Sequence, residues 1–364
     1  MHVCTRQTGP VSRNLPMRAA WGNTRPVPLR AHQPRRQTRR SLLTRLTQVG
    51  LLAAGLELSA ACDRLPGQAP RVPRIGYVAN ESPAGAQTQA LIAGLGDYGY
   101  IVGQNLELES RFPTEATQAA AMIGDLLRLG VDVLVTGGTA AAVAAKQETS
   151  TTPIVGISVD PIASGLVQSL ARPGGNVTGI ATGVVDFVGK WLELLLKIEP
   201  TLKRVALLYN SENPGHVAVR EQLRTLAPTA GLELVPVEDP TTANVDDAFE
   251  KAVASGAEAL LWSGQSDAKT DARMAALTLS HHLVSLGVNP TYPANGGLMS
   301  FSGDFIAMWR RAAYFIDRIL KGAKPADLPV QLPTTFELIV NHTTAAALGI
   351  TIPDEVAIQV TSWI

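Results

Sequence analysis

Few residues of this chain stand in a pattern that supports catalysis or metal binding. His281 and His282 are adjacent near the end of an expected helix, so their side chains point in different directions and cannot hold one metal ion without distant ligands. Gly94 to Gly99 matches the pattern GxGxxG, but it ends an expected helix, whereas a dinucleotide-binding turn follows a strand and opens a helix. We expect a helix C-cap there instead.

Other signatures of enzymes are missing from the sequence. The chain contains no GxSxG, HExxH or Walker sequence. His216 and His342 fall near expected helix starts, where a polar surface position is the simplest interpretation. The sequence therefore predicts no catalytic residue, no cofactor and no metal site.

Polar residues that follow expected strands form a second group of candidates. In a parallel sheet the carboxyl ends of the strands meet the amino ends of helices, where free backbone N–H groups and the positive end of the helix dipole attract anions. Residues in these loops are therefore expected to bind a ligand. The candidates are Asn80, Glu81, Gly138, Thr139, Ala140 and Asp160 in the first half of the chain, and Asn210, Ser211 and Gln265 in the second.

Some of these candidates suggest particular ligand groups. A carboxylate could bind the backbone N–H groups of Thr139 and Ala140, with the Thr139 hydroxyl as a further donor; Thr139 could equally be only the N-cap of the following helix, and the two roles are compatible. Asp160 could face a ligand ammonium group, although an Asp-Pro turn alone also favours aspartate. The aromatic residues that could sandwich an apolar ligand, or else fill a core, are Tyr77, Trp262 and Tyr292.

The elements that must position these residues follow from the hydrophobic pattern. Short apolar runs alternate with helical stretches of ten or more residues, which is typical of parallel sheets covered on both faces. The expected strands are Ile75–Ala79, Leu106–Arg111, Val131–Val135, Ile154–Val159, Val205–Tyr209, Leu232–Val237 and Ala259–Trp262. The expected helices include Gln87–Tyr98, Ala116–Leu129, Val184–Ile198, Val217–Leu226, Val245–Ala254 and Phe305–Leu320. About 290 ordered residues exceed what one core usually covers, so two domains are expected.

The turn residues between Ile157 and Gly183 have an unusual order. An Asp-Pro turn is followed by Arg-Pro-Gly-Gly-Asn-Val-Thr-Gly at residues 172–179. Three further blocks show matching patterns, at Gly296–Gly303, Ile319–Val330 and Phe336–Asn341. With these features the sequence resembles the substrate-binding proteins of one family of ABC transporters. The resemblance covers roughly residues 74–353.

This resemblance implies an α/β fold of two doubly wound parallel-sheet lobes joined by a three-crossing hinge, as in type I periplasmic binding proteins. It implies that residues 72–181 and 297–328 form lobe 1, and that residues 182–296 and 329–355 form lobe 2. The crossings are then expected near Ala181, Gly296 and Val330.

The resemblance also implies a function. Such a protein closes on a small-molecule ligand in the interlobe cleft and delivers it to an ABC permease and its ATPase. Family members are commonly described as tryptophan or tyrosine transport components, so an aromatic or branched amino acid is the first expected ligand. A ligand-sensing receptor that acts with a separate signalling partner is the alternative, and an enzyme on the same scaffold is disfavoured because no nucleophile or metal cluster is evident.

The amino-terminal residues resemble an export signal. Residues 38–43 look like a twin-arginine signal, and the apolar run at 46–61 is too short for a spanning helix, which needs about 20 apolar residues. The small residues before Cys62 resemble a lipobox, so residues 1–61 are expected to be removed and Cys62 lipidated, on the periplasmic or extracellular face of the membrane. Cleavage after Ala61 by an ordinary signal peptidase, or an uncleaved anchor, is the alternative.

The charge balance of the mature chain argues against nucleic acid as a partner. The whole chain has 31 basic and 31 acidic residues, and removing the ten arginines and one glutamate of residues 1–61 leaves 21 basic and 30 acidic residues. Nucleic-acid binding needs a basic surface. Because Cys4 also lies in the removed segment, no disulfide is expected within the mature chain.

Overall fold

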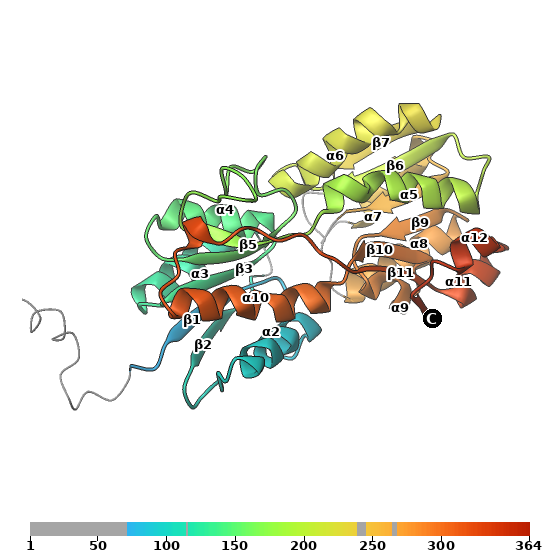
Figure 1. Ribbon diagram of the computed structural model, residues 1–364. Coiled ribbons are helices and arrows are strands. Elements are labelled where there is room, and N and C mark those ends of the chain that lie inside the picture. The colour runs from blue at the N-terminus through green and yellow to red at the C-terminus, as the bar shows by residue number, and fades with distance from the viewer. Residues whose placement is uncertain (1–70, 114–115, 239–244, 264–267) are drawn as a thin grey trace, which may run out of the picture. The chain divides into compact units, whose positions relative to one another are not determined.

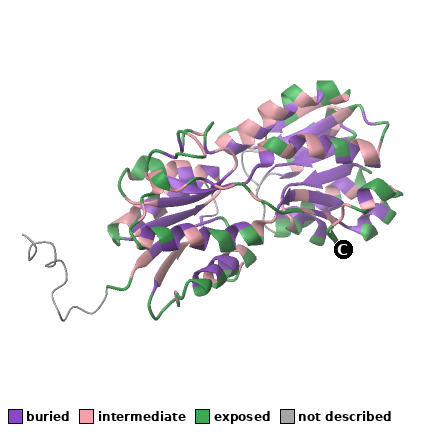
Figure 2. Cartoon of the chain, in the orientation of Figure 1, coloured by how far each residue is buried: buried purple, intermediate pink, exposed green. Residues whose placement is uncertain are grey.

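Two β-sheets organise the chain in the computed structural model, which describes residues 71–113, 116–238, 245–263 and 268–364 (Figure 1). The predicted export signal with Cys62, and Gln265, lie outside the described residues. In both sheets the central strands are buried, whereas the strands at the edges are partly or fully exposed (Figure 2).

The first sheet has five parallel strands in the order β2-β1-β3-β4-β5. They are β1 (Arg74–Val78), β2 (Glu107–Arg111), β3 (Val133–Gly137), β4 (Ile154–Ser158) and β5 (Val177–Ala181). One face packs against α2 (Ala86–Asp97) and α10 (Phe305–Leu320), and the other against α3 (Ala116–Arg128) and α4 (Thr139–Glu148). The sheet thus has helices on both faces, as its continuous apolar strands predict.

The second sheet has seven strands in the order β12-β11-β10-β9-β8-β6-β7. They are β6 (Arg204–Tyr209), β7 (Glu233–Glu238), β8 (Ala259–Trp262), β9 (Val284–Gly287), β10 (Met299–Gly303), β11 (Phe336–Val340) and β12 (Ser362–Trp363). On one face lie α5 (Val184–Ile198), α6 (Pro214–Leu226), α11 (His342–Ala347) and α12 (Asp354–Ala357). On the other lie α7 (Val245–Ala254), α8 (Ala268–Ser280) and α9 (Thr291–Ala294). The pairing is parallel except that β11 runs antiparallel to β10.

The chain passes between the two sheets three times, which confirms the predicted number of crossings. It leaves the first sheet between β5 and α5, and leaves the second between β10 and α10. It returns to β11 after Gln331, whose N–H donates to the Gly179 carbonyl at 3.0 Å and whose carbonyl accepts from the Ala181 N–H at 2.9 Å. Gln331 therefore extends the edge of the first sheet just before the third crossing.

The second crossing differs from the prediction. Residues 297–328 were assigned to lobe 1, but β10 pairs with β9 and β11 and so belongs to the second sheet. The predicted crossing point near Gly296 lies before β10, and a Cβ at the next residue, Gly297, would lie 2.3 Å from the Tyr292 ring. The chain leaves the second sheet at Asp304, whose carboxylate caps α10 by accepting from the Ala307 N–H at 2.8 Å.

The GxGxxG sequence serves helix packing and helix termination. A Cβ at Gly94 would lie 2.3 Å from the Arg310 carbonyl oxygen, so the missing side chain lets α2 approach α10 closely. Gly99 follows the C-cap residue Tyr98 with φ of 83°, the left-handed conformation that glycine adopts without strain. The predicted C-cap is confirmed.

Candidate functional site

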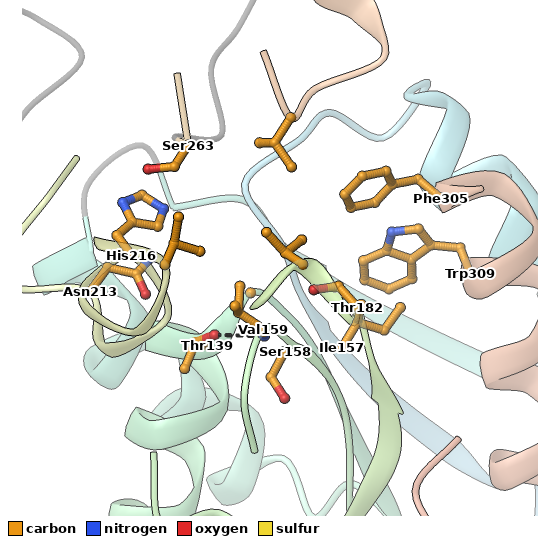
Figure 3. Close-up of a pocket in the computed structure, with 14 residues that line it drawn as sticks. Thr139, Ile157, Ser158, Val159, Thr182, Asn213, His216, Ser263, Phe305 and Trp309 are labelled. Atoms are coloured by element: carbon orange, nitrogen blue, oxygen red, sulfur yellow. Dashed lines mark hydrogen bonds between the residues drawn. The ribbon is translucent and has the colours of Figure 1, made fainter. Parts of the chain in front are cut away.

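A cavity of about 590 Å³, counted with its opening to solvent, lies where strand ends of both sheets meet helix starts (Figure 3). The first sheet and its crossing contribute Gly138, Thr139, Ile157, Ser158, Val159 and Thr182. The second lobe and the start of α10 contribute Val184, Asn213, His216, Val219, Ser263, Val288, Phe305 and Trp309.

The start of α4 forms one wall of this cavity. Gly138 is the N-cap, with φ of 90°, and its N–H donates to the Ile157 carbonyl at 2.8 Å. Thr139 was expected as the possible N-cap, but it is the first residue of the helix, because only glycine readily takes the conformation that the preceding position requires. The Thr139 hydroxyl instead accepts from the Val159 N–H at 3.0 Å and can still donate its own proton.

The start of α6 forms the facing wall. Asn213 caps this helix by accepting from the Gly215 N–H at 2.9 Å. His216, expected at the surface, lines the cavity, and its Nδ1 accepts from the Asn210 N–H at 3.2 Å. Burial lowers the pKa of His216 to about 4, so the ring is neutral at pH 7. Because Nδ1 is the acceptor, Nε2 carries the proton and is a hydrogen-bond donor.

The two walls touch through a residue without a side chain. Gly215 lies in the first turn of α6 and is buried. A Cβ at this position would lie 2.7 Å from the Thr139 hydroxyl oxygen and 2.9 Å from the Val159 Cβ. The close approach of α6 to the start of α4 therefore depends on glycine.

Apolar side chains cover the part of the cavity next to α10. Phe305 and Trp309 lie on this side (Figure 3), and Trp309 packs edge-on against Tyr77 with ring centroids 5.4 Å apart. Tyr77 is fully buried behind Trp309 and does not line the cavity. Trp262 and Tyr292 are likewise buried in the core against α7 and α8. The aromatic candidates are thus core residues, and the aromatic residues of the cavity come from α10.

Two acidic candidates serve local structure. The Glu81 carboxylate accepts from the N–H groups of Gln87 at 2.9 Å and Thr88 at 2.8 Å, at the start of α2. The Asp160 carboxylate accepts from the N–H groups of Ile162 at 3.0 Å and Ala163 at 2.9 Å. Neither residue lines the cavity, so these positions do not support the expected contact between Asp160 and a ligand ammonium group.

Three further candidates do not line the cavity. Asn80 is exposed. The Asn210 side chain accepts from the Glu212 N–H at 2.7 Å, and the Ser211 hydroxyl bonds the Glu238 carboxylate. Of the predicted residues, Gly138 and Thr139 line the cavity directly, and Ala140 follows them in the first turn of α4.

Helix starts and neutral side chains line the cavity. In the part of the chain that the structure describes, every lining residue is neutral. The starts of α4, α5, α6 and α10 all contribute lining residues, so the positive ends of four helices point toward this region. The lining residues at these starts are Gly138 for α4, Val184 for α5, Asn213 for α6 and Phe305 for α10.

Within the described ranges no group of His, Cys, Asp or Glu could hold a metal ion. The helices of the same ranges include none with the length and apolar character that a membrane span requires.

Comparisons with known proteins agree with this architecture. A tyrosine-binding protein from Clostridioides difficile (strain R20291) is 25% identical over 267 residues, which are 71% of this chain and 75% of that protein. The crystal structure of a conserved domain protein from Vibrio cholerae has 28% identity and a TM-score of 0.75, covering 81% of this chain and 100% of that one. An ABC domain from Streptococcus pneumoniae in complex with L-Trp has 25% identity and a TM-score of 0.73, covering 80% and 99%.

The family described as ABC transporter substrate binding protein matches residues 78–364, which include both sheets except the first four residues of β1, and every residue that lines the cavity. Proteins of this family are extracytoplasmic and bind their substrates without chemical conversion. The type I periplasmic binding fold, the cavity between helix starts of two lobes and this match together show that the chain belongs to the ABC transporter substrate-binding protein family.

Proposed function

We propose that the protein is the solute-binding component of an ABC importer and that it binds an aromatic amino acid between its lobes. The observation that carries this proposal is the cavity itself, which joins neutral helix starts to an aromatic wall. The names of the relatives, a tyrosine-binding protein and a complex with L-Trp, support the same ligand class.

The ligand carboxylate would bind at the start of α4. Backbone N–H groups in the first turn of a helix have no partner within the helix, and the helix dipole adds to their attraction for an anion. Thr139 and Ala140 supply two such groups, and the Thr139 hydroxyl supplies a third donor because its Val159 contact uses only an acceptor site. His216 adds an Nε2 donor from the facing wall.

The aromatic side chain of the ligand would lie toward α10. Phe305 and Trp309 offer two rings there, and aromatic pairs gain energy beyond the apolar area they bury. Because one wall comes from each lobe, a ligand that fills the cavity binds this arrangement better than one in which the lobes are apart.

Calorimetric titration with L-tyrosine, L-tryptophan and L-phenylalanine tests the ligand class, with L-leucine, L-lysine and L-glutamate as comparisons. We expect saturable binding of the aromatic amino acids. Small-angle X-ray scattering of the same samples should show that the protein becomes more compact when the ligand binds. Selective binding of lysine or glutamate would contradict the ligand assignment, since a neutral cavity offers no ion pair to a charged side chain.

We further propose export and attachment to the outer face of the membrane through lipidated Cys62, which would hold the protein near its permease and ATPase. Labelling with a fatty-acid analogue tests this part independently. Wild-type protein should incorporate the label and sediment with membranes, whereas Cys62→Ser should do neither. Incorporation by the variant, or none by the wild type, would contradict the anchor.

A further inference from the structure

Thr182 occupies an unusual place, at the first crossing between the lobes and in the lining of the cavity. It directly follows β5, and its N–H donates to the Ser158 carbonyl at 2.8 Å, so its backbone is fixed to the first sheet. Gly183, which follows with φ of 71°, turns the chain into α5. The position of the Thr182 side chain is therefore set by both neighbouring elements.

The Thr182 hydroxyl is buried without a hydrogen-bond partner. The residue is 6% exposed, and its Oγ1 contacts no donor or acceptor. In the described ranges, three other buried hydroxyls share this property, those of Thr136, Ser300 and Ser302, but Thr182 alone among the four lines the cavity. Buried polar groups are normally hydrogen-bonded, so an unpartnered hydroxyl at a binding cavity indicates a partner supplied by the ligand.

The surroundings of Thr182 indicate which part of the ligand would supply this partner. In Figure 3 Thr182 lies between Ile157 and the aromatic pair Phe305 and Trp309, while Thr139 and Asn213 lie on the other side of the cavity. If the ligand carboxylate binds at Thr139, the side chain of the ligand extends toward Thr182.

We propose that Thr182 forms a polar subsite that accepts a hydrogen bond from a donor on the aromatic ring of the ligand, such as a phenol hydroxyl or an indole N–H. This subsite rests on the proposed function and deepens it, because it explains how an otherwise apolar wall distinguishes ligands of similar shape. A site with a buried polar group rejects a ligand that lacks the matching group, since that polar group then stays unpaired.

The test compares L-tyrosine with L-phenylalanine, which differ by one hydroxyl, in the wild type, Thr182→Val and Thr182→Ser. Valine has the shape of threonine without the hydroxyl, and serine keeps the hydroxyl. We expect the wild type to prefer tyrosine by about tenfold or more. Thr182→Val should lose most of that preference through weaker tyrosine binding, while Thr182→Ser should retain it.

Equal weakening of both ligands by Thr182→Val would overturn the subsite, because the hydroxyl would then contact the amino or carboxyl group that both share. Unchanged binding of both would overturn it as well. Thermal unfolding without ligand adds a second criterion: removing an unpartnered hydroxyl should leave the melting temperature unchanged or raised, and a clear decrease would show a structural partner. Failure of the wild type to bind L-tyrosine, L-phenylalanine and L-tryptophan alike would instead contradict the proposed ligand class, and the subsite with it.

Discussion

Gly215 of α6 lies directly against Thr139 of α4, so close that a Cβ at position 215 would come within 2.7 Å of the Thr139 hydroxyl oxygen. The two residues belong to different lobes and lie beside the same cavity. The same Thr139 oxygen accepts from the Val159 N–H, which fixes its position. This contact therefore limits how near the lobes can come to each other.

Gly215→Ala should weaken ligand binding by about tenfold or more, because the added methyl group would overlap backbone-linked atoms of Val159 only when the lobes are together. The same change should leave folding stability unchanged or raise it by up to about 1 kcal/mol, since alanine favours a helix. Calorimetry and urea unfolding measure the two effects. Gly189→Ala in α5 is the control, because a Cβ there meets its nearest neighbour at an ordinary 3.6 Å. Normal affinity in Gly215→Ala would show that the contact does not limit closure.

Thr139→Val should weaken the binding of an aromatic amino acid by roughly ten- to a hundredfold, because a charge-assisted donor to the ligand carboxylate is lost. It should also lower the free energy of unfolding by about 1 kcal/mol, since the partly buried Val159 N–H loses its acceptor. Thr139→Ser keeps both contacts and should resemble the wild type. If Thr139→Val lowered stability alone, the carboxylate would have to bind elsewhere.

Asp160→Ala should act on stability and hardly on affinity. Its carboxylate accepts from two backbone N–H groups of its own turn, and losing such a cap costs about 1 kcal/mol. Asp160→Asn keeps an acceptor oxygen and should lose less. Calorimetry and thermal unfolding of both variants separate the two roles: an affinity loss of tenfold or more for amino-acid ligands, with normal stability, would restore Asp160 as an ammonium partner.

His216 should make the folded protein less stable as the pH falls. Burial lowers its pKa in the folded state to about 4, whereas the ordinary value is 6.5. Between these values the unfolded chain binds a proton that the folded chain does not, so the free energy of unfolding should fall from pH 6.5 to pH 4 by about 2–3 kcal/mol from this residue. Urea unfolding of the wild type and His216→Gln at pH 7 and pH 4.5 measures it. Parallel pH dependence in both proteins would exclude His216 as the cause.

Seven of the twelve strands and six of the long helices were predictable, because most of them bury an apolar run of their own. The run Val205–Tyr209 differs from β6 by one residue, and Val184–Ile198 and Phe305–Leu320 match α5 and α10. The antiparallel β11 was not foreseen, because its direction depends on where the third crossing returns to the second sheet and not on its own residues.

The candidate site was predictable only where a glycine turn opens a helix, at Gly138 and Thr139. His216 and Thr182 were missed, because a polar residue beside a helix start is usually exposed and nothing local shows that the other lobe covers it. A useful signal was present for His216, which stands two residues after an Asn-Pro helix start that follows β6. Phe305 and Trp309 were missed because they lie on a helix of the first lobe that follows a strand of the second.

The neutral lining of the cavity determines how ligand affinity depends on the salt concentration outside the cell. An extracytoplasmic receptor meets changing ionic strength, and salt weakens attraction between exposed charges. In the proposed complex, helix starts and neutral donors hold the ligand carboxylate, and the described lining contains no lysine or arginine. Buried interactions are screened much less than exposed ion pairs. Ligand affinity should therefore change little between dilute and saline surroundings.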